Sequence, residues 1–174
     1  MAKTSGGIRT WNMTANQGNV LKGPTVEQMV EQNIAAVYDD FARQGFSRMQ
    51  PFYVGKVEQR MIDFAKAKNV PVAGDEVYMN TAQLGHARRT SKLANGIAAT
   101  KQELVTFPKR RSSMRLYFDT DKDRFVYHDG KVKYVIDPDY ELKISRKKKR
   151  KVVFITASTT NGKEFNKANY VEVK

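Results

Sequence analysis

Apolar residues recur with two different periods along the chain, and the change falls near Pro108. Before this point they follow helical spacing, and after it they alternate with polar residues, as in Met114, Leu116 and Phe118. A change from a period of about 3.6 to a period of two predicts helices followed by strands. We therefore expect an α+β fold: N-terminal helices, then an antiparallel sheet of four or five strands with a helix packed on it.

Residues 25–74 are predicted to form a helical hairpin that covers a sheet or mediates assembly. The first helix starts at Pro24-Thr25 and ends at Gly45, and the second runs from about Gly55 to Lys68. Residues 1–24 are polar and rich in glycine, so we expect a flexible arm there. Trp11 either anchors this arm or belongs to a tail without a function.

Residues 75–174 are predicted to form one α+β domain. Its first helix is capped by Asn80 or Thr81 and closed by Gly96, and a capping box at 100–103 starts a short helix that ends at Pro108. The strands that follow are separated by a turn at Asp129-Gly130 and by further turns at 137–139 and 161–163. The apolar run KVVFITAS is typical of a central strand.

The net charge of the chain gives information about its binding partner rather than about its fold. There are 31 Lys and Arg residues against 18 Asp and Glu, which gives a net charge of +13. This surplus favours a nucleic acid as the partner, RNA first and DNA as the alternative. A basic virion protein lying against packaged DNA is the other interpretation. The candidate nucleic-acid contacts are Arg88, Lys109, Arg110, Arg111, Tyr117, His128, Lys147, Lys148, Lys149 and Arg150.

These candidates differ in kind. The run 146–151 is predicted to be a hairpin loop, either a solvated charge run or a nonspecific, salt-sensitive contact. Tyr117 is either a surface aromatic that stacks on bases or a core residue. His128 flanks the Asp129-Gly130 turn and is either a strand residue or a second proton carrier.

Several classes of site are excluded or disfavoured by composition. The chain has no cysteine, which excludes disulfides and thiolate chemistry, and its two histidines argue against a zinc site. No metal or cofactor is expected, although a magnesium site made of carboxylates stays open. No apolar run reaches the length of a membrane span, and the N-terminus lacks the apolar segment of a signal peptide.

The segment GHARRTSK at 85–92 is the strongest candidate for chemistry. On a helix, His86, Arg89 and Lys92 form a slanting row that can converge on one phosphate. Histidine can carry a proton near neutral pH, and the cations can hold the charge that develops on phosphorus. A hydroxyl on a central strand, Thr156 or Ser158, can hydrogen-bond a phosphate oxygen. The alternative is the solvated face of an ordinary helix.

The order of these parts resembles the phage nuclease domains of the barnase–EndoU–colicin–RelE class. The resemblance covers about residues 75–174 and rests on VYMNTAQLGHARRTSK, ELVTFPKRR, MRLYFDTDKDRFVYHDGKVKYVI and VVFITAST. It implies a metal-independent ribonuclease in which His86 is the helix histidine, Lys92 its basic partner and Thr156 the strand hydroxyl. An inactive or structural relative stays open.

We therefore expect an endoribonuclease of phage or prophage origin with His86, Arg89, Lys92 and Thr156 as catalytic residues. The first alternative is a virion or head-associated protein without catalytic activity, and the second is a regulator that binds nucleic acid. Residues 1–74 would contact phage structural proteins or a second copy of the chain. The location would be the host cytoplasm or the virion, and the choice between toxin, effector and scaffold stays open.

Overall fold

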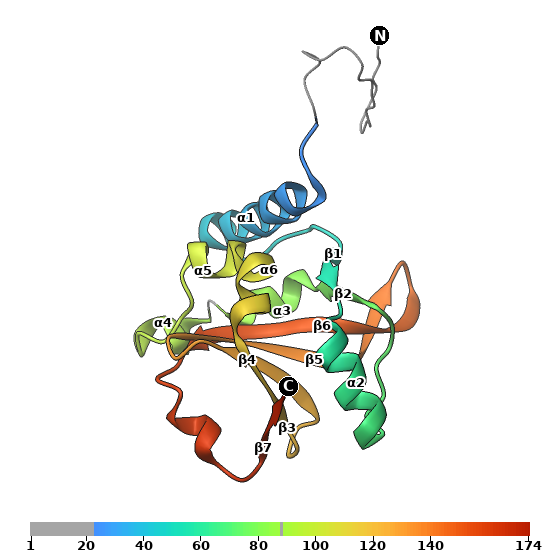
Figure 1. Ribbon diagram of the computed structural model, residues 1–174. Coiled ribbons are helices and arrows are strands. Elements are labelled where there is room, and N and C mark those ends of the chain that lie inside the picture. Colours follow the sequence, from blue (N-terminus) through green and yellow to red (C-terminus); the bar gives the residue numbers. More distant parts are fainter. Residues whose placement is uncertain (1–22, 88) are drawn as a thin grey trace, which may run out of the picture.

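The computed structural model describes residues 23–87 and 89–174 (Figure 1). The predicted arm at 1–24 lies almost entirely outside these residues. The N-terminal half contains α1 (Val26–Gln44), β1 (Phe52–Lys56), α2 (Gln59–Lys68), β2 (Glu76–Met79), α3 (Thr81–His86), α4 (Thr90–Ala94), α5 (Lys101–Val105) and α6 (Phe107–Arg110). The C-terminal half contains η1 (Arg111–Ser113), β3 (Arg115–Asp119), β4 (Arg124–His128), β5 (Val132–Ile144), β6 (Lys147–Thr159), η2 (Lys163–Asn166) and β7 (Tyr170–Val173).

The strands form one sheet in the order β1-β2-β6-β5-β4-β3-β7. The α+β prediction is confirmed, but the prediction of a four- or five-stranded antiparallel sheet is wrong. The sheet has seven strands and is mixed, because β2 pairs parallel with β6. Strands β1 and β2 are short. Strand β2 is held by pairing with β6, which is distant in the sequence, and β1 pairs with β2, so local patterns do not reveal either strand.

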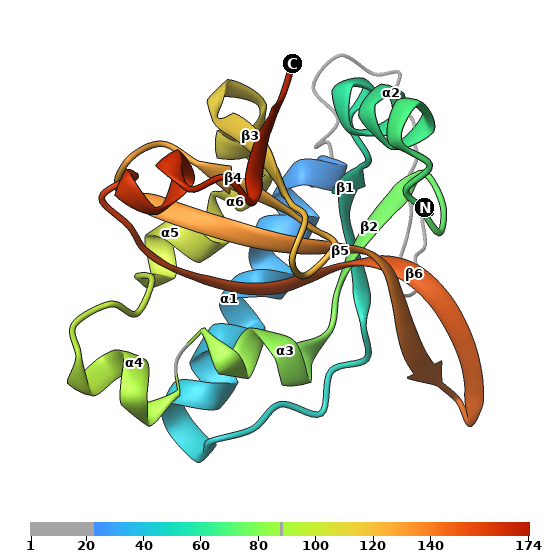
Figure 2. The ribbon, with the colours of Figure 1, turned by 90° about the horizontal axis from the view of Figure 1, so that it is seen from below.

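One face of the sheet is buried under α1, α3, α5 and α6 (Figures 1 and 2). The alternation in β3, β4 and β5 is confirmed, because one set of alternate side chains lies in this core. Phe107 lies at its centre, with ring centroids 4.8 Å from Tyr134 and 5.2 Å from Phe154. The core side chains contributed by β3, β4 and β5 are Leu116, Phe118, Phe125, Tyr127, Val132, Tyr134 and Ile136.

Residues 25–74 do not form the predicted helical hairpin. The caps of α1 are as expected, with a capping box between Thr25 and Gln28 and a left-handed Gly45. However, β1 separates α1 from α2 and pairs with β2, so this segment contributes a strand to the sheet. Ile34 of α1 and Met61 of α2 are fully buried in the same core as the sheet.

Strands β5 and β6 form a long hairpin that projects beyond the other strands (Figure 2). Its turn residues, Ser145 and Arg146, have φ of 50° and 68°, as a two-residue type I′ turn requires. The turn predicted at 137–139 is absent, because β5 runs through this segment with an irregularity in register between Asp137 and Tyr140. A bulge accommodates Pro138, which cannot donate to the ladder.

Candidate functional site

The segment GHARRTSK does not lie on one continuous helix. Helix α3 ends at His86, Arg89 is extended with φ −61° and ψ 153°, and α4 starts at Thr90. The chain is drawn to the free edge of β6, where Ala98 pairs with Ser158. This tertiary pairing reorients α4, so that Lys92 faces inward and is only 7% exposed. Ser91 and Ala94, on either side of it along α4, are exposed.

Lys92 and Thr156 are in direct contact. The Lys92 Nζ donates to Thr156 Oγ1 at 2.6 Å and to the Ala157 carbonyl oxygen at 3.2 Å. Thr156 lies at a bulge in β6, since it pairs with Val135 while Ile136 pairs with Phe154. An extra residue in one strand redirects its neighbours, and bulges of this kind are common beside active sites. The two residues are 64 positions apart, so the fold itself assembles this contact.

The Lys92 ammonium group has no carboxylate within ion-pair distance among the residues that the structure describes. Burial, and then the positive charges of Arg89 and Lys133, lower the pKa of Lys92 to about 8. Lys133 itself is paired with Glu164 at 2.7 Å. A buried cation that keeps its charge near neutral pH without a counter-ion is typical of a site that receives an anion.

The predicted catalytic residues are therefore brought together only in part. Lys92 and Thr156 are in contact, and exposed Arg89 lies close enough to Lys92 to lower its pKa. The backbone of His86 ends α3, but its side chain lies outside the part of the chain that the structure describes, as does all of Arg88.

Arg111 and Tyr117 are buried, contrary to the prediction that they contact nucleic acid. The Arg111 guanidinium lies 5.8 Å from the centre of the Phe107 ring and fills the space beside Gly55. Tyr117 is 9% exposed and packs on Phe165, 5.0 Å between ring centroids. For Tyr117 the alternative of a core residue describes the structure, because alternation along β3 places it in a small cluster with Val126 and Phe165. Arg111 is buried in η1, outside the strands, where no alternation signals its burial.

His128 is a packed side chain rather than an exposed proton carrier. Its ring stacks on Phe165 with centroids 3.9 Å apart and planes within 1°. Its Nδ1 accepts a hydrogen bond from the Gly130 amide at 3.2 Å. Burial, and then the charge of Arg115, lower the pKa of His128, which favours the neutral ring. The alternative of a strand residue beside a turn describes this geometry better than the proton carrier does.

The remaining basic candidates are on the surface. Lys109 pairs with Glu31 at 3.1 Å, and Arg110 lies 3.7 Å from Asp129. The run at 146–151 is not a loop as predicted, because the turn ends at Arg146 and residues 147–151 are strand residues of β6. Lys147, Lys148, Lys149 and Arg150 are all exposed on the hairpin.

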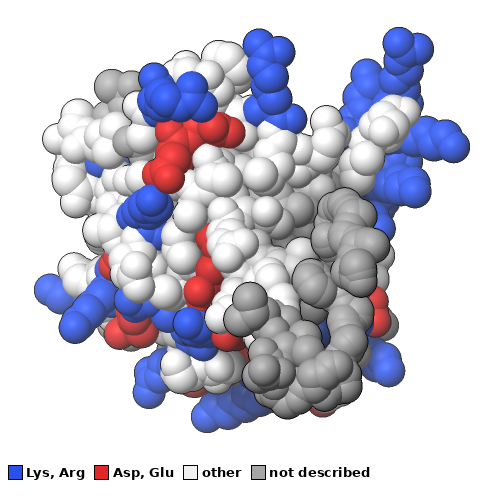
Figure 3. All heavy atoms as spheres, turned by 90° about the horizontal axis from the view of Figure 1, so that it is seen from above, with Lys and Arg blue, Asp and Glu red and all other residues white. Residues whose placement is uncertain are grey.

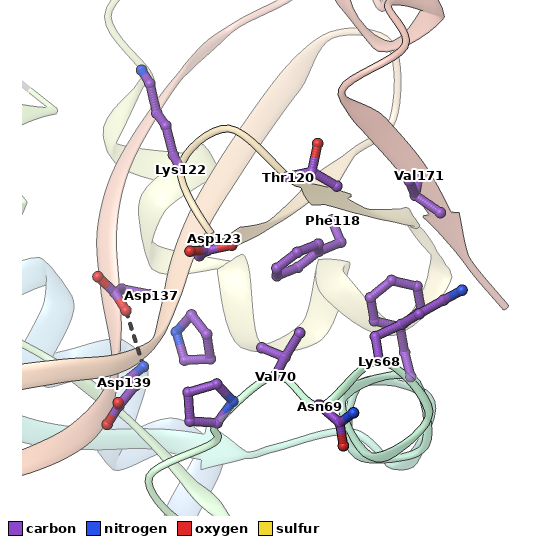
Figure 4. Close-up of a pocket in the computed structure, with 13 residues that line it drawn as sticks. Lys68, Asn69, Val70, Phe118, Thr120, Lys122, Asp123, Asp137, Asp139 and Val171 are labelled. Carbon is purple, nitrogen blue, oxygen red and sulfur yellow. Dashed lines mark hydrogen bonds between the residues drawn. The ribbon is translucent and has the colours of Figure 1, made fainter.

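A separate cavity of about 640 Å³ lies between α2, the β3–β4 turn and the irregular part of β5 (Figure 4). Phe64, Val70 and Phe118 supply apolar walls, while Lys68, Lys122 and three aspartates line its edge. Two of these carboxylates are engaged, since Asp137 pairs with Arg124 and Asp139 with Arg150. The lining shares no residue with the Lys92 site.

Sequence reasoning missed Lys133 and Glu164 as neighbours of the Lys92 site. Lys133 could have been placed, because it alternates with Val132 and Tyr134 of the core and must point to the opposite face. Glu164 has no such signal, since it lies in a short 3₁₀ turn after β6. Its position depends on how the C-terminal segment returns to β3.

Among the described residues, no group of three or more His, Asp or Glu side chains is placed to hold a metal ion. None of the helices in the described ranges combines the length and the apolar character that crossing a membrane requires. Comparisons of the chain with protein-family models, with curated proteins and with solved structures each found no match.

Proposed function

We propose that the protein is a metal-independent endoribonuclease and that the edge of β6 is its phosphate site. The observation that carries this proposal is the Lys92 ammonium, buried against Thr156 and Ala157 with no carboxylate partner in the described part of the chain. A phosphodiester is the anion that a protein with a net charge of +13 is best suited to receive.

In the proposed reaction, the ribose 2′-oxygen attacks the adjacent phosphorus and the bond from phosphorus to the 5′-oxygen breaks. The products are a 2′,3′-cyclic phosphate and a free 5′-hydroxyl. His86 would accept the proton of the 2′-hydroxyl. Lys92 would stabilise the charge on the phosphate oxygens and, with a pKa of about 8, could also donate a proton to the leaving oxygen. Thr156 holds Lys92 in place.

The resemblance to phage nuclease domains of the barnase–EndoU–colicin–RelE class supports the same reading. It pairs a basic residue after the helix histidine with a hydroxyl on a late strand, and Lys92 and Thr156 meet in this way. Strand β1 lies before residue 75, outside the stretch that the resemblance covers. The proposed origin is therefore a phage or prophage, with the host cytoplasm as the place of action.

The test is cleavage of a labelled RNA in excess EDTA by wild type, His86→Ala, Lys92→Ala and Lys101→Ala. Lys101 is the matched control, because it is an exposed lysine on α5 that is paired with Asp39. We expect cleavage by wild type and Lys101→Ala, with losses of about 100-fold or more in the other two variants. No cleavage by folded wild type on any RNA would overturn the proposal.

A second candidate is a virion or head-associated protein that neutralises packaged DNA. It is favoured by the distribution of Lys and Arg over the face seen from above, rather than in one patch (Figure 3). In that case all four proteins would bind DNA and RNA equally, with strong salt dependence and no cleavage.

A further inference from the structure

The basic run on β6 is divided between the two faces of the β5–β6 hairpin. Because side chains alternate along a strand, Lys147, Lys149 and Lys151 point to one face and Lys148 and Arg150 to the other. The cross-strand register places Lys143 opposite Lys148, so Lys143 shares the second face. We call Lys147, Lys149 and Lys151 the front lysines, and Lys143, Lys148 and Arg150 the back cations.

The two sets differ in how their charge is compensated. On the back, Lys148 lies 3.6 Å from Glu141, and Arg150 lies 2.7 Å from Asp139 and 3.7 Å from Glu141. No ion pair involves a front lysine within the described part of the chain, and the Lys151 ammonium lies 5.0 Å from the centre of the Tyr78 ring. The front lysines therefore form a row of uncompensated charge.

The front of the hairpin is continuous with the face of the sheet opposite α1. Because side chains alternate along β6, Val153 and Ile155 lie on the same face as Lys151. These two residues form a small apolar cluster with Leu142. The next residue along β6 is Thr156, the partner of Lys92. Figure 2, which looks onto this side, shows β6 running in front of α1 from near α4 to the hairpin.

We propose that single-stranded RNA lies along this face of β6, from the phosphate at Lys92 to phosphates on the front lysines. This rests on the proposed function and names the path of its substrate. The ten residues from Lys147 to Thr156 span about 30 Å in an extended strand, so several nucleotides fit along the path. One row of cations suits one phosphate backbone. Two of the three back cations, Lys148 and Arg150, already pair with carboxylates.

The test compares two triple variants of equal charge change: Lys147→Gln/Lys149→Gln/Lys151→Gln and Lys143→Gln/Lys148→Gln/Arg150→Gln. Binding of a fluorescent 2′-O-methyl RNA 12-mer is measured, because an RNA without a free 2′-hydroxyl cannot be cleaved by the proposed reaction. We expect the front variant to raise Kd about tenfold or more and to flatten the salt dependence by about two units of slope. The back variant should stay within about threefold of wild type, with both folds checked by circular dichroism.

A trinucleotide is the second probe. It is too short to reach the hairpin from Lys92, so both variants should bind it as wild type does. Equal weakening of the 12-mer by the two variants would mean nonspecific attraction, and no weakening by the front variant would mean another path; either result overturns this proposal. Failure of wild type to cleave an unmodified RNA, with the front–back difference retained, would overturn the nuclease alone.

Discussion

Two cations withdrawn from solvent can be compared in this protein, Arg60 in part and Lys92 almost completely, and among the described residues only Arg60 has a carboxylate partner. The Arg60 guanidinium lies 3.2 Å from Glu58 and donates to the carbonyl oxygens of Arg111 and Met114. Tyr127 donates to the same Glu58 carboxylate at 2.7 Å. The Lys92 ammonium donates to the neutral oxygens of Thr156 and Ala157, and no carboxylate of the described residues pairs with it.

The difference separates a stabilising cluster from the proposed binding site. Glu58 compensates Arg60, and Arg60 joins α2 to the chain before β3 through two carbonyl oxygens. Lys92 has lost part of its hydration without gaining a carboxylate, which costs stability. A protein can keep such a destabilising buried cation where an anionic ligand supplies the negative charge that the fold does not.

The largest expected effect comes from Lys92→Met. Cleavage should fall by about 100- to 1,000-fold, because the charge on the phosphate oxygens loses its buried cation. The free energy of unfolding should stay within about 1 kcal/mol of wild type or rise, since an apolar chain of similar length replaces an uncompensated ion. Cleavage rates and urea unfolding check both parts, and a strong destabilisation would assign Lys92 to the fold instead.

Glu58→Gln should lower stability and leave cleavage unchanged, the reverse of what we expect for Lys92→Met. The free energy of unfolding should fall by about 1–2 kcal/mol, because Arg60 loses its counter-ion while part of the cluster remains solvated. Cleavage by the folded variant should be unchanged. Urea unfolding and a cleavage assay below the transition measure the two effects. Loss of cleavage in a folded Glu58→Gln variant would contradict the division into two clusters.

Thr156→Val tests the acceptor of the Lys92 ammonium, with Thr156→Ser as its control. Removing the hydroxyl leaves a buried cation with one hydrogen bond fewer, so unfolding should become easier by about 1 kcal/mol. Cleavage should fall about tenfold, because Lys92 is less well positioned. Serine restores the oxygen and should restore most of both properties. Equal behaviour of the two variants would remove Thr156 from the site.

The smallest effects are those of pH. As pH rises, the contribution of Lys92 to stability should increase while its binding of phosphate should weaken. The folded pKa of Lys92 is about 8, below the ordinary lysine value of 10.5. Between these values the unfolded chain binds more protons, so this group makes stability rise with pH. Binding of a phosphate analogue should weaken as pH rises through about 8. Lys92→Met should lack both trends, as titration calorimetry and urea unfolding can show.

Local patterns in the sequence predicted the local parts of this fold. The caps at Thr25 and Thr100, the Gly130 turn and the alternation of β3, β4 and β5 depend on neighbouring residues and agree with the structure. The break between α3 and α4 was not predictable in this way, because it follows from pairing of Ala98 with Ser158 across the chain.

The site was predictable as a set of residue types but not as a geometry. A lysine in a basic helix and a threonine on a central strand were identified from chemistry. That Lys92 is buried follows from the reorientation of α4, and that Thr156 meets it follows from the bulge in β6. The burial of Lys92 and its contact with Thr156 both depend on strand register. The hydrophobic pattern alone does not determine this register for a segment at the edge of a sheet.

The parallel pair of β2 with β6 has a consequence for the order of events during synthesis. Val77 pairs with Val152, and Lys92 with Thr156, so neither contact can form before the C-terminal part of the chain exists. Pairing over such separations also makes folding slow. A nascent chain therefore carries no assembled site until β6 has been synthesised, and the proposed attack on RNA cannot start earlier.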